Sequence, residues 1–401
     1  MNTQSAGSSV PRIPTLDGLR GIAILVVILF HCLLSTPTSG LRRIDPLIDK
    51  GAGLFAPLFL DLFFVISGFL ITSILDRTRD ADHPVRTFYL RRALRIVPLY
   101  YGFLLVIVLF LQHLPERFIG TPASMIWEFS FLTNVPVALD GSKSVGYFYP
   151  HFWTLAIEEQ FYILWPLLML LIPKHLNVKT CLAVIAFSLV ARAVLAFTVS
   201  FGAAFYLTAG RLDGLAAGGL VALLHARRPD LLTKWAKKVM WLSLGACLVG
   251  QLSLIVLYLA DRKDFGAQIW VTVMPFVATA FFSAVVAQLA MQPQGDRPRW
   301  LLSPVLTSVA RYSYGMYALH VPLITLLFHY ELVVQQAPLA GFDLPYRIYF
   351  FILVAGLSYG AGLVSWHLYE KQFLKLAPGY RYSRKMQPAA ASLPAAAIPV
   401  P

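Results

Sequence analysis

Long apolar segments recur along this chain of 401 residues, and each is close to the roughly 20 residues that a helix needs to cross a bilayer. Short polar stretches rich in arginine and lysine separate them. The segments cover 16–36, 53–75, 96–113, 155–173, 179–200, 205–225, 239–259, 269–291, 305–328 and 346–368. The pattern predicts an all-α, polytopic membrane helix bundle with about ten transmembrane helices. The segment 205–225 fits least well, because Arg211 and Asp213 interrupt it.

The distribution of basic residues supports this count of helices. Only 13% of the residues are charged and 58% are hydrophobic, whereas soluble chains carry about 25% charged residues. Of the 33 lysines and arginines, 21 fall on every second connecting segment, starting with the N-terminal one, and 8 fall on the others. This bias follows the positive-inside rule and predicts that both termini are cytoplasmic. The net charge of +13 is therefore read as a topology signal, and nucleic acid is not expected as a partner.

The two ends of the chain differ in composition from the rest. We expect a disordered N-terminal tail at 1–13, a membrane domain at 14–376 and a disordered Pro/Ala-rich tail at 377–401. The first apolar segment lacks a cleavage site and is expected to stay as a helix. The three cysteines form no metal-binding spacing, so no metal site is predicted.

Ionisable residues inside membrane helices are costly and point to functional sites. Arg20 and His31 lie eleven residues apart, which returns them to one face of a helix with a rise of about 16 Å. Arg20 is expected near the cytoplasmic end and His31 in the outer half. A neutral imidazole at this position can act as a general base, although a histidine that only bonds neighbouring helices fits the spacing as well.

Polar residues on four other segments also fall in the outer half of the predicted bundle. They are Asp61, Glu158, Arg211, Asp213 and His320. Agreement in depth among separate helices predicts one polar chamber that opens outward. For Arg211 and Asp213, an ion-pair network that holds helices together is an equal alternative.

A cluster of arginines lies on the predicted cytoplasmic side, in the segment FYLRRALRIVPLYY. On a helix, Arg92 and Arg95 are neighbours, and guanidinium groups suit phosphate oxygens. A stop signal for membrane insertion is the simpler reading of the cluster by itself.

Seven motifs in order, between about residues 13 and 374, resemble the acyltransferase-3 family of bacterial membrane O-acyltransferases. They are IPTLDGLRGIAILVVILFH, LDLFFVISGFLI, FYLRRALRIVPLY, HFWTLAIEEQFYILWP, GRLDGLAAGGL, ARYSYGMYALHVPL and YEKQF. The chain departs from the family pattern at Thr154, where serine is usual, and at Gln372, where proline is more usual.

The resemblance implies transfer of an acyl group, by default acetyl, from cytoplasmic acetyl-CoA or another acyl-CoA to a hydroxyl of an extracytoplasmic glycan or lipid-linked sugar, in a bacterial inner membrane. It implies that Arg20, Arg92 and Arg95 bind the donor. It makes His31 the expected catalytic residue, as general base or as acyl-imidazole, with Glu158 as its partner.

The remaining residues that the resemblance brings into the predicted chamber or acceptor site are Asp61, His151, Trp153, Arg211, Asp213 and His320. Some relatives carry a C-terminal SGNH-type domain, and none is expected here because the chain ends soon after the tenth segment. A competing interpretation is a secondary transporter or flippase that uses the buried histidines and carboxylates as a proton relay. No inverted repeat supports it.

Overall fold

The structure is a computed structural model that describes residues 13–35, 58–110, 124–141, 145–259, 263–333 and 344–376, with residues 114, 118, 120 and 121. The predicted tails at 1–13 and 377–401 lie outside the described residues, except Ile13. Throughout the described ranges the chain forms helices and no β-strand. The prediction of an all-α polytopic bundle is therefore confirmed.

Each predicted apolar segment corresponds to one long helix in the described part of the chain. These helices are α1 (Pro14–Ser35), α3 (Phe59–Thr78), α4 (Pro84–Phe110), α8 (Trp153–Leu171), α9 (Asn177–Thr198), α11 (Leu212–Arg227), α12 (Pro229–Leu259), α13 (Lys263–Met291), α14 (Pro304–His329) and α15 (Leu344–Ser365). By length and composition, seven helices in the described ranges can cross a membrane. The chain is a multi-pass membrane protein, and ten spans with cytoplasmic termini stay predictions.

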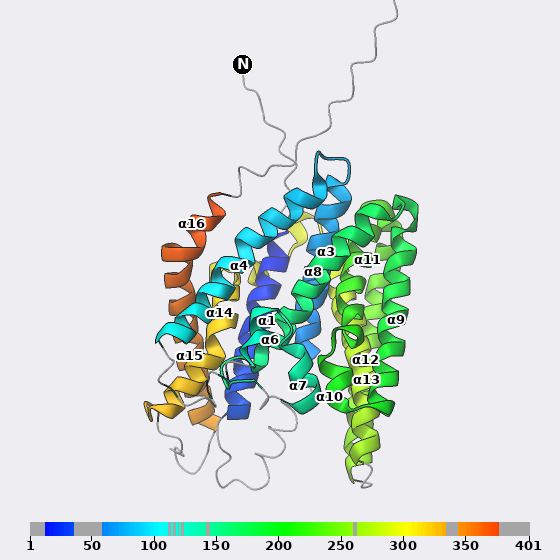
Figure 1. Cartoon of the computed structure of the whole chain (residues 1–401). Coiled ribbons are helices and arrows are strands. Elements are labelled where there is room, and N and C mark those ends of the chain that lie inside the picture. Colours follow the sequence, from blue (N-terminus) through cyan, green and yellow to red (C-terminus); the bar gives the residue numbers. More distant parts are fainter. Residues whose placement is uncertain are drawn as a thin grey trace, which may run out of the picture.

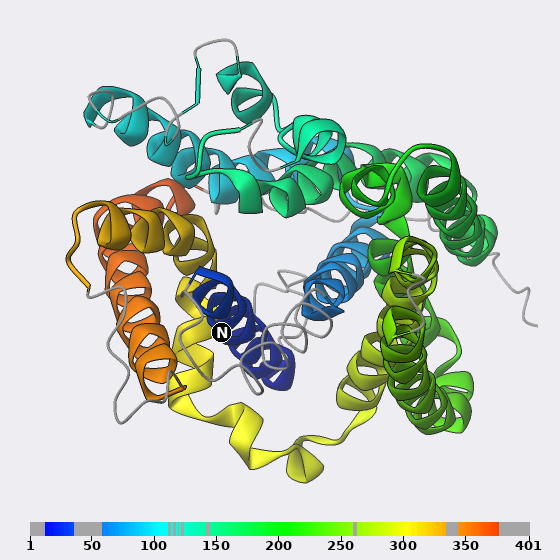
Figure 2. The same ribbon diagram turned by 90° about the horizontal axis from the view of Figure 1, so that it is seen from below.

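The helices form a bundle in which α1 and α3 are enclosed by the others (Figures 1 and 2). The helix α1 packs on α14, which in turn packs on α15, whereas α3 packs on α11. The two halves of the bundle therefore each have their own buried centre. In Figure 1, the short helices α7 (Asn134–Asp140) and α10 (Phe201–Tyr206) lie in the lower part of the bundle, α6 (Met125–Phe129) lies near its mid-height, and α16 (Lys371–Leu374) lies toward its top.

Glycines allow α3 and α11 to approach closely. A Cβ atom at Gly68 would lie 1.8 Å from the carbonyl oxygen of Leu215, and one at Gly218 would lie 2.0 Å from that of Val65. Both distances are far below van der Waals contact, so no larger residue fits. Small residues at helix contacts are common in membranes, where packing rather than water exclusion drives association.

Several helices begin at other positions than the apolar pattern predicts, and α12, for example, begins at Pro229 rather than near residue 239. The helix α4 starts at Pro84 rather than near residue 96, so Arg92 and Arg95 lie within it. Its first turns are polar, and hydropathy locates only the apolar part of a helix that continues beyond it. Near residue 205, the chain forms α10 and a 3-10 turn before α11 begins at Leu212. Asp213 lies in the first turn of α11, where the helix dipole stabilises the negative charge of a carboxylate.

The outward faces of the helices are apolar. Leu171 on α8 is 75% exposed, and Leu242 on α12 is 73% exposed. Exposed leucines over a whole helix face are unfavourable in water and favourable in hydrocarbon. This surface agrees with a protein embedded in lipid.

Arg79, directly after α3, closes the C-terminal end of α8. Its guanidinium donates to the carbonyl oxygens of Met169 at 2.6 Å, Leu170 at 3.0 Å and Ile172 at 2.6 Å. The last carbonyls of a helix have no partner within it. A single arginine thus satisfies three of them and attaches α8 to α3.

Candidate functional site

A cavity of about 380 Å³ lies between α1, α3, α4, α8 and α14. This volume is within the range of small-molecule sites, roughly 300–1,000 Å³. Six charged side chains line it, namely Arg20, Arg92, Arg95, Asp17, Glu158 and Glu159. We call it the arginine pocket. The three arginines that the sequence predicted as donor-binding residues therefore meet in one cavity.

Arg92 offers an unused hydrogen-bond donor in this pocket. Its guanidinium carbon lies 3.9 Å from the centre of the Tyr162 ring, which fixes the side chain by a cation–π contact. Its Nε is buried and has no hydrogen-bond partner among the described residues. A buried donor without a partner costs free energy. An anionic oxygen, such as one from a phosphate, would satisfy it.

Glu158 also belongs to the arginine pocket. Its Oε1 accepts a hydrogen bond of 2.8 Å from Ser67, and its Oε2 accepts one of 3.1 Å from Tyr162. The sequence predicted Glu158 as the partner of His31. The side chain of His31 instead forms hydrogen bonds with the Val27 carbonyl oxygen and with His320.

One wall of the pocket is apolar. Ile66, Leu70, Ile71 and Ile74 on α3 line it, in addition to the charged side chains of α4 and α8. A charged end and an apolar wall together suit an elongated ligand that has an anionic group at one end and an uncharged arm.

Three histidines form a second group, which we call the histidine trio. The ring centres of His31 and His320 lie 4.9 Å apart, those of His151 and His320 lie 5.0 Å apart, and those of His31 and His151 lie 6.4 Å apart. They come from α1, α14 and the 3-10 turn Pro150–Phe152 before α8. His151 and His320 are buried, and His31 is partly exposed. The sequence predicted all three as site residues, but it placed them in one chamber with Asp61, Arg211 and Asp213 and not in a group of their own.

Tyr317 and Thr154 lie at the boundary between the arginine pocket and the histidine trio. Both line the pocket. The Tyr317 hydroxyl donates to the carbonyl oxygen of His151 at 2.5 Å. The Thr154 hydroxyl lies 2.5 Å from the Tyr317 hydroxyl. The Tyr317 ring centre is 5.2 Å from that of His151. Apolar periodicity gives no signal for either residue, although Thr154 occupies the serine position of the motif.

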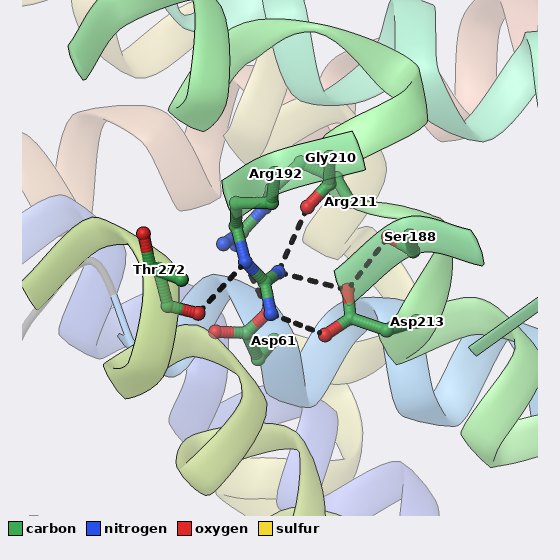
Figure 3. A network of polar contacts seen from close by, with 7 residues as sticks. All are labelled: Asp61, Ser188, Arg192, Gly210, Arg211, Asp213 and Thr272. Carbon is green, nitrogen blue, oxygen red and sulfur yellow. Dashed lines mark hydrogen bonds and ion pairs between the residues drawn. The ribbon is translucent and has the colours of Figure 1, made fainter. Parts of the chain in front are cut away.

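Asp61, Arg211 and Asp213 belong to a different group, a buried ion-pair network with Arg192 (Figure 3). Arg192 donates to both carboxylate oxygens of Asp213, at 3.1 and 2.9 Å, and Arg211 donates to Asp61 at 2.9 Å. All of these side chains are at most 1% exposed. Arg192 also donates to the carbonyl oxygens of Gly210 and Thr272.

Aromatic rings cover the remaining side of Arg211. Its guanidinium carbon lies 4.9 Å from the Phe205 ring centre, 5.5 Å from Phe64 and 6.0 Å from Trp153. Trp153 therefore faces this network through its ring and not the histidine trio. None of the charged residues of the network lines the arginine pocket. The single chamber predicted from common depth is thus divided into three groups, with Glu158 in the arginine pocket, His320 in the histidine trio and the other residues in the network.

The site residues that sequence reasoning did not single out are Ser67, Tyr162 and Tyr317. Tyr162 falls within the motif HFWTLAIEEQFYILWP and Tyr317 within ARYSYGMYALHVPL, so the motifs held the signal. In the described part of the chain, no group of three or more histidine, cysteine or carboxylate side chains has a geometry that could hold a metal ion.

Comparison with known proteins adds a family to this geometry. The family described as "Acyltransferase domain" matches residues 13–366. The peptidoglycan O-acetyltransferase OatA of Listeria monocytogenes is 25% identical over 336 residues, which cover 78% of this chain and 50% of that protein. The O-acetyltransferase OatA of Staphylococcus aureus is 27% identical over 370 residues, which cover 87% of this chain and 56% of that protein. The chain thus spans about half the length of these relatives. No solved structure matches it.

Proposed function

The chain belongs to the acyltransferase domain family, and on that premise we propose that it is a membrane O-acetyltransferase. It takes an acetyl group from cytoplasmic acetyl-CoA and transfers it to a hydroxyl of an extracytoplasmic glycan, in a bacterial cytoplasmic membrane. The named relatives are O-acetyltransferases, and one of them is a peptidoglycan O-acetyltransferase. The glycan class of the acceptor follows from that likeness.

The observation that carries the proposal is the arginine pocket with the histidine trio beyond its end. Arg20, Arg92 and Arg95 line a cavity that reaches Thr154 and Tyr317. Tyr317 contacts the trio directly. A donor with a phosphate-rich end and a reactive group at the tip of a flexible arm fits this order of groups.

In this mechanism the arginines bind the nucleotide end of the donor. Before the donor binds, the carboxylates of Asp17, Glu158 and Glu159 balance the charge of the arginines within the pocket. The cation–π contact with Tyr162 already holds the Arg92 side chain in place at that stage. The pantetheine arm lies along the apolar wall of α3. The thioester then reaches the region of Tyr317, next to the histidine trio.

His31 supplies the base. Its imidazole takes the proton of the acceptor hydroxyl as the oxygen attacks the thioester carbonyl. The carbon–sulfur bond breaks, and the departing CoA thiolate takes up the proton. An alternative route through an acyl-imidazole on His31 uses the same lone pair and has the same overall balance.

The test uses membrane vesicles supplied with acetyl-CoA that carries a radiolabelled acetyl group. The native chain is expected to move label into glycan or lipid-linked material. His31→Ala at matched expression is expected to lower the rate at least 100-fold, the lower range of general acid–base contributions. His225→Ala, on α11 and outside both groups, is the control and is expected to keep the native rate. Equal labelling by the His31 variant would exclude His31 from the chemistry, and no labelling or CoA release by the native chain would exclude acetyl transfer.

A further inference from the structure

His320 lies beside His31, and its hydrogen bonds define which ring nitrogen carries its proton. The Nδ1 of His320 is 2.7 Å from the carbonyl oxygen of Tyr317. A carbonyl oxygen accepts and cannot donate, so Nδ1 of His320 must carry the hydrogen. In the neutral ring, Nε2 of His320 then has a lone pair.

The same reasoning applies to His31. Its Nδ1 is 2.9 Å from the carbonyl oxygen of Val27, one turn earlier on α1. Nδ1 of His31 is therefore the protonated nitrogen. It also lies 3.3 Å from Nε2 of His320, which is free to accept. The proton of His31 Nδ1 is shared by two acceptors, a carbonyl oxygen and an imidazole nitrogen.

From these contacts we propose that His320 is a positioning residue that holds His31 in the tautomer with an unprotonated Nε2. The inference rests on the proposed function, since it specifies how His31 is prepared for the reaction. The second acceptor orients the ring more firmly than the carbonyl of its own helix can, because the two contacts come from different helices, α1 and α14. Only Nε2 is then available to take a proton or an acyl group.

His320 also acts after His31 has reacted. When Nε2 of His31 takes the hydroxyl proton, the ring becomes positively charged and its Nδ1–H becomes a stronger donor. The lone pair of His320 faces that hydrogen and stabilises the cation. An acyl-imidazole on Nε2 carries the same positive charge before deprotonation, so the role of His320 is the same on either route. His151 has no comparable contact, since both of its ring nitrogens are buried without a partner among the described residues.

Two amide substitutions separate the two contacts of His320. In His320→Asn, the amide reaches the position of Nδ1 and keeps the bond to Tyr317. In His320→Gln, the amide reaches the position of Nε2, and its carbonyl oxygen can accept from His31. We expect His320→Asn to lower kcat about 10- to 100-fold, as for groups that orient a reactive ligand, with KM for acetyl-CoA unchanged. His320→Gln is expected to recover most of the native kcat.

The result that would overturn the proposal is a native kcat in His320→Asn, or equal losses in both variants together with a raised KM. The second outcome would indicate a general packing role.

Nitrogen-15 NMR of histidine-labelled protein in micelles tests the tautomer without relying on activity. The signals of His31 and His320 are assigned from the spectra of His31→Ala and His320→Gln. Both residues are expected to show a protonated Nδ1 and an unprotonated Nε2. A protonated Nε2 on neutral His31 would overturn the inference even if the chain transfers acetyl groups. If the expected tautomer is found in a chain that transfers no acetyl groups, the hydrogen-bond arrangement of His31 and His320 is supported and only the proposed function is excluded.

Discussion

The arginine pocket and the ion-pair network place similar residues inside the same bundle, yet they differ in how their charges are satisfied. In the network, Arg192 and Asp213 form two direct hydrogen bonds and are almost completely buried (Figure 3). In the pocket, Arg92 stacks on a tyrosine and keeps a buried Nε without a partner in the described structure. Each arginine of the network has a carboxylate at hydrogen-bond distance, although Asp61 Oδ2 and the Nε and Nη1 of Arg211 are buried without a partner among the described residues. Arg92 forms no ion pair in that part of the chain, and it lines a cavity that a ligand can enter.

This difference shows how to read charges in membrane helices. A costly group in a membrane segment points to function by default, but the default fails where each charge has its counter-charge at hydrogen-bond distance. A charge that lines a cavity and has no counter-charge at hydrogen-bond distance is the better indicator of a binding site. The comparison predicts that changes in the network alter folding, and that changes in the pocket alter donor binding.

The largest effect is expected from breaking the network. Asp213→Asn removes one charge and leaves Arg192 buried and uncompensated, which costs about 3–5 kcal/mol for buried pairs. Thermal unfolding in detergent micelles should show a large fall in Tm or loss of folded protein. Asp230→Asn is the matched control, because Asp230 pairs with Arg228 at 3.0 Å where both side chains are more than half exposed. An unchanged Tm for the Asp213 variant would contradict the view that pairing holds this region together.

A smaller and different effect is expected in the pocket. Arg95→Gln removes a charge that faces the cavity and should raise KM for acetyl-CoA about 10- to 100-fold, which corresponds to the roughly 1.5–3 kcal/mol of a charged hydrogen bond. The kcat and the Tm should stay near their native values, since uniform binding is lost and no buried pair is broken. Steady-state kinetics in vesicles measure this. Arg91→Gln, on the same helix but not lining the cavity, should leave KM unchanged, and equal effects of the two variants would remove the distinction.

The smallest effect is expected in the pH dependence of Tm, from a carboxyl group that belongs to neither the network nor the pocket. Both oxygens of Glu128 on α6 are buried without a hydrogen-bond partner among the described residues, and burial raises the pKa of Glu128 from 4.5 to about 7. Because the folded-state pKa lies above the unfolded one, the stabilisation is fully present below pH 4.5 and is lost as pH rises to about 7. We expect Tm to fall by a few degrees across this window.

The matched variants for this last prediction are Glu128→Gln and Asp140→Asn. The first should lose most of this pH dependence. The second changes an exposed carboxylate nearby on α7 and should keep it. The same pH dependence in the Glu128 variant as in the native chain would show that Glu128 is not the group responsible.

The sequence predicted the bundle well because an apolar run of bilayer length has few alternatives to a membrane helix. It also predicted that the arginine motif on α4 and Arg20 on α1 form one group. It did not predict the division of the outer polar residues. Hydropathy gives the depth of a residue along its helix, but it gives neither the direction of the side chain nor the neighbouring helix. Asp61 therefore looked equivalent to His320, although one pairs with Arg211 and the other with His31.

The attachment of α8 through Arg79 has a consequence for the order in which the protein is assembled. Arg79 and its first acceptor, Met169, are 90 residues apart in the chain. At about 5–20 residues per second, a ribosome takes roughly 5 to 20 seconds to make the intervening chain. Throughout that interval α3 has been synthesised, but the α8 carbonyls that accept from Arg79 have not, so Arg79 lacks these hydrogen-bond partners. The part of the pocket that α8 lines can form only after this delay. Slower translation between the two helices would lengthen the period in which an incomplete bundle is exposed to proteases.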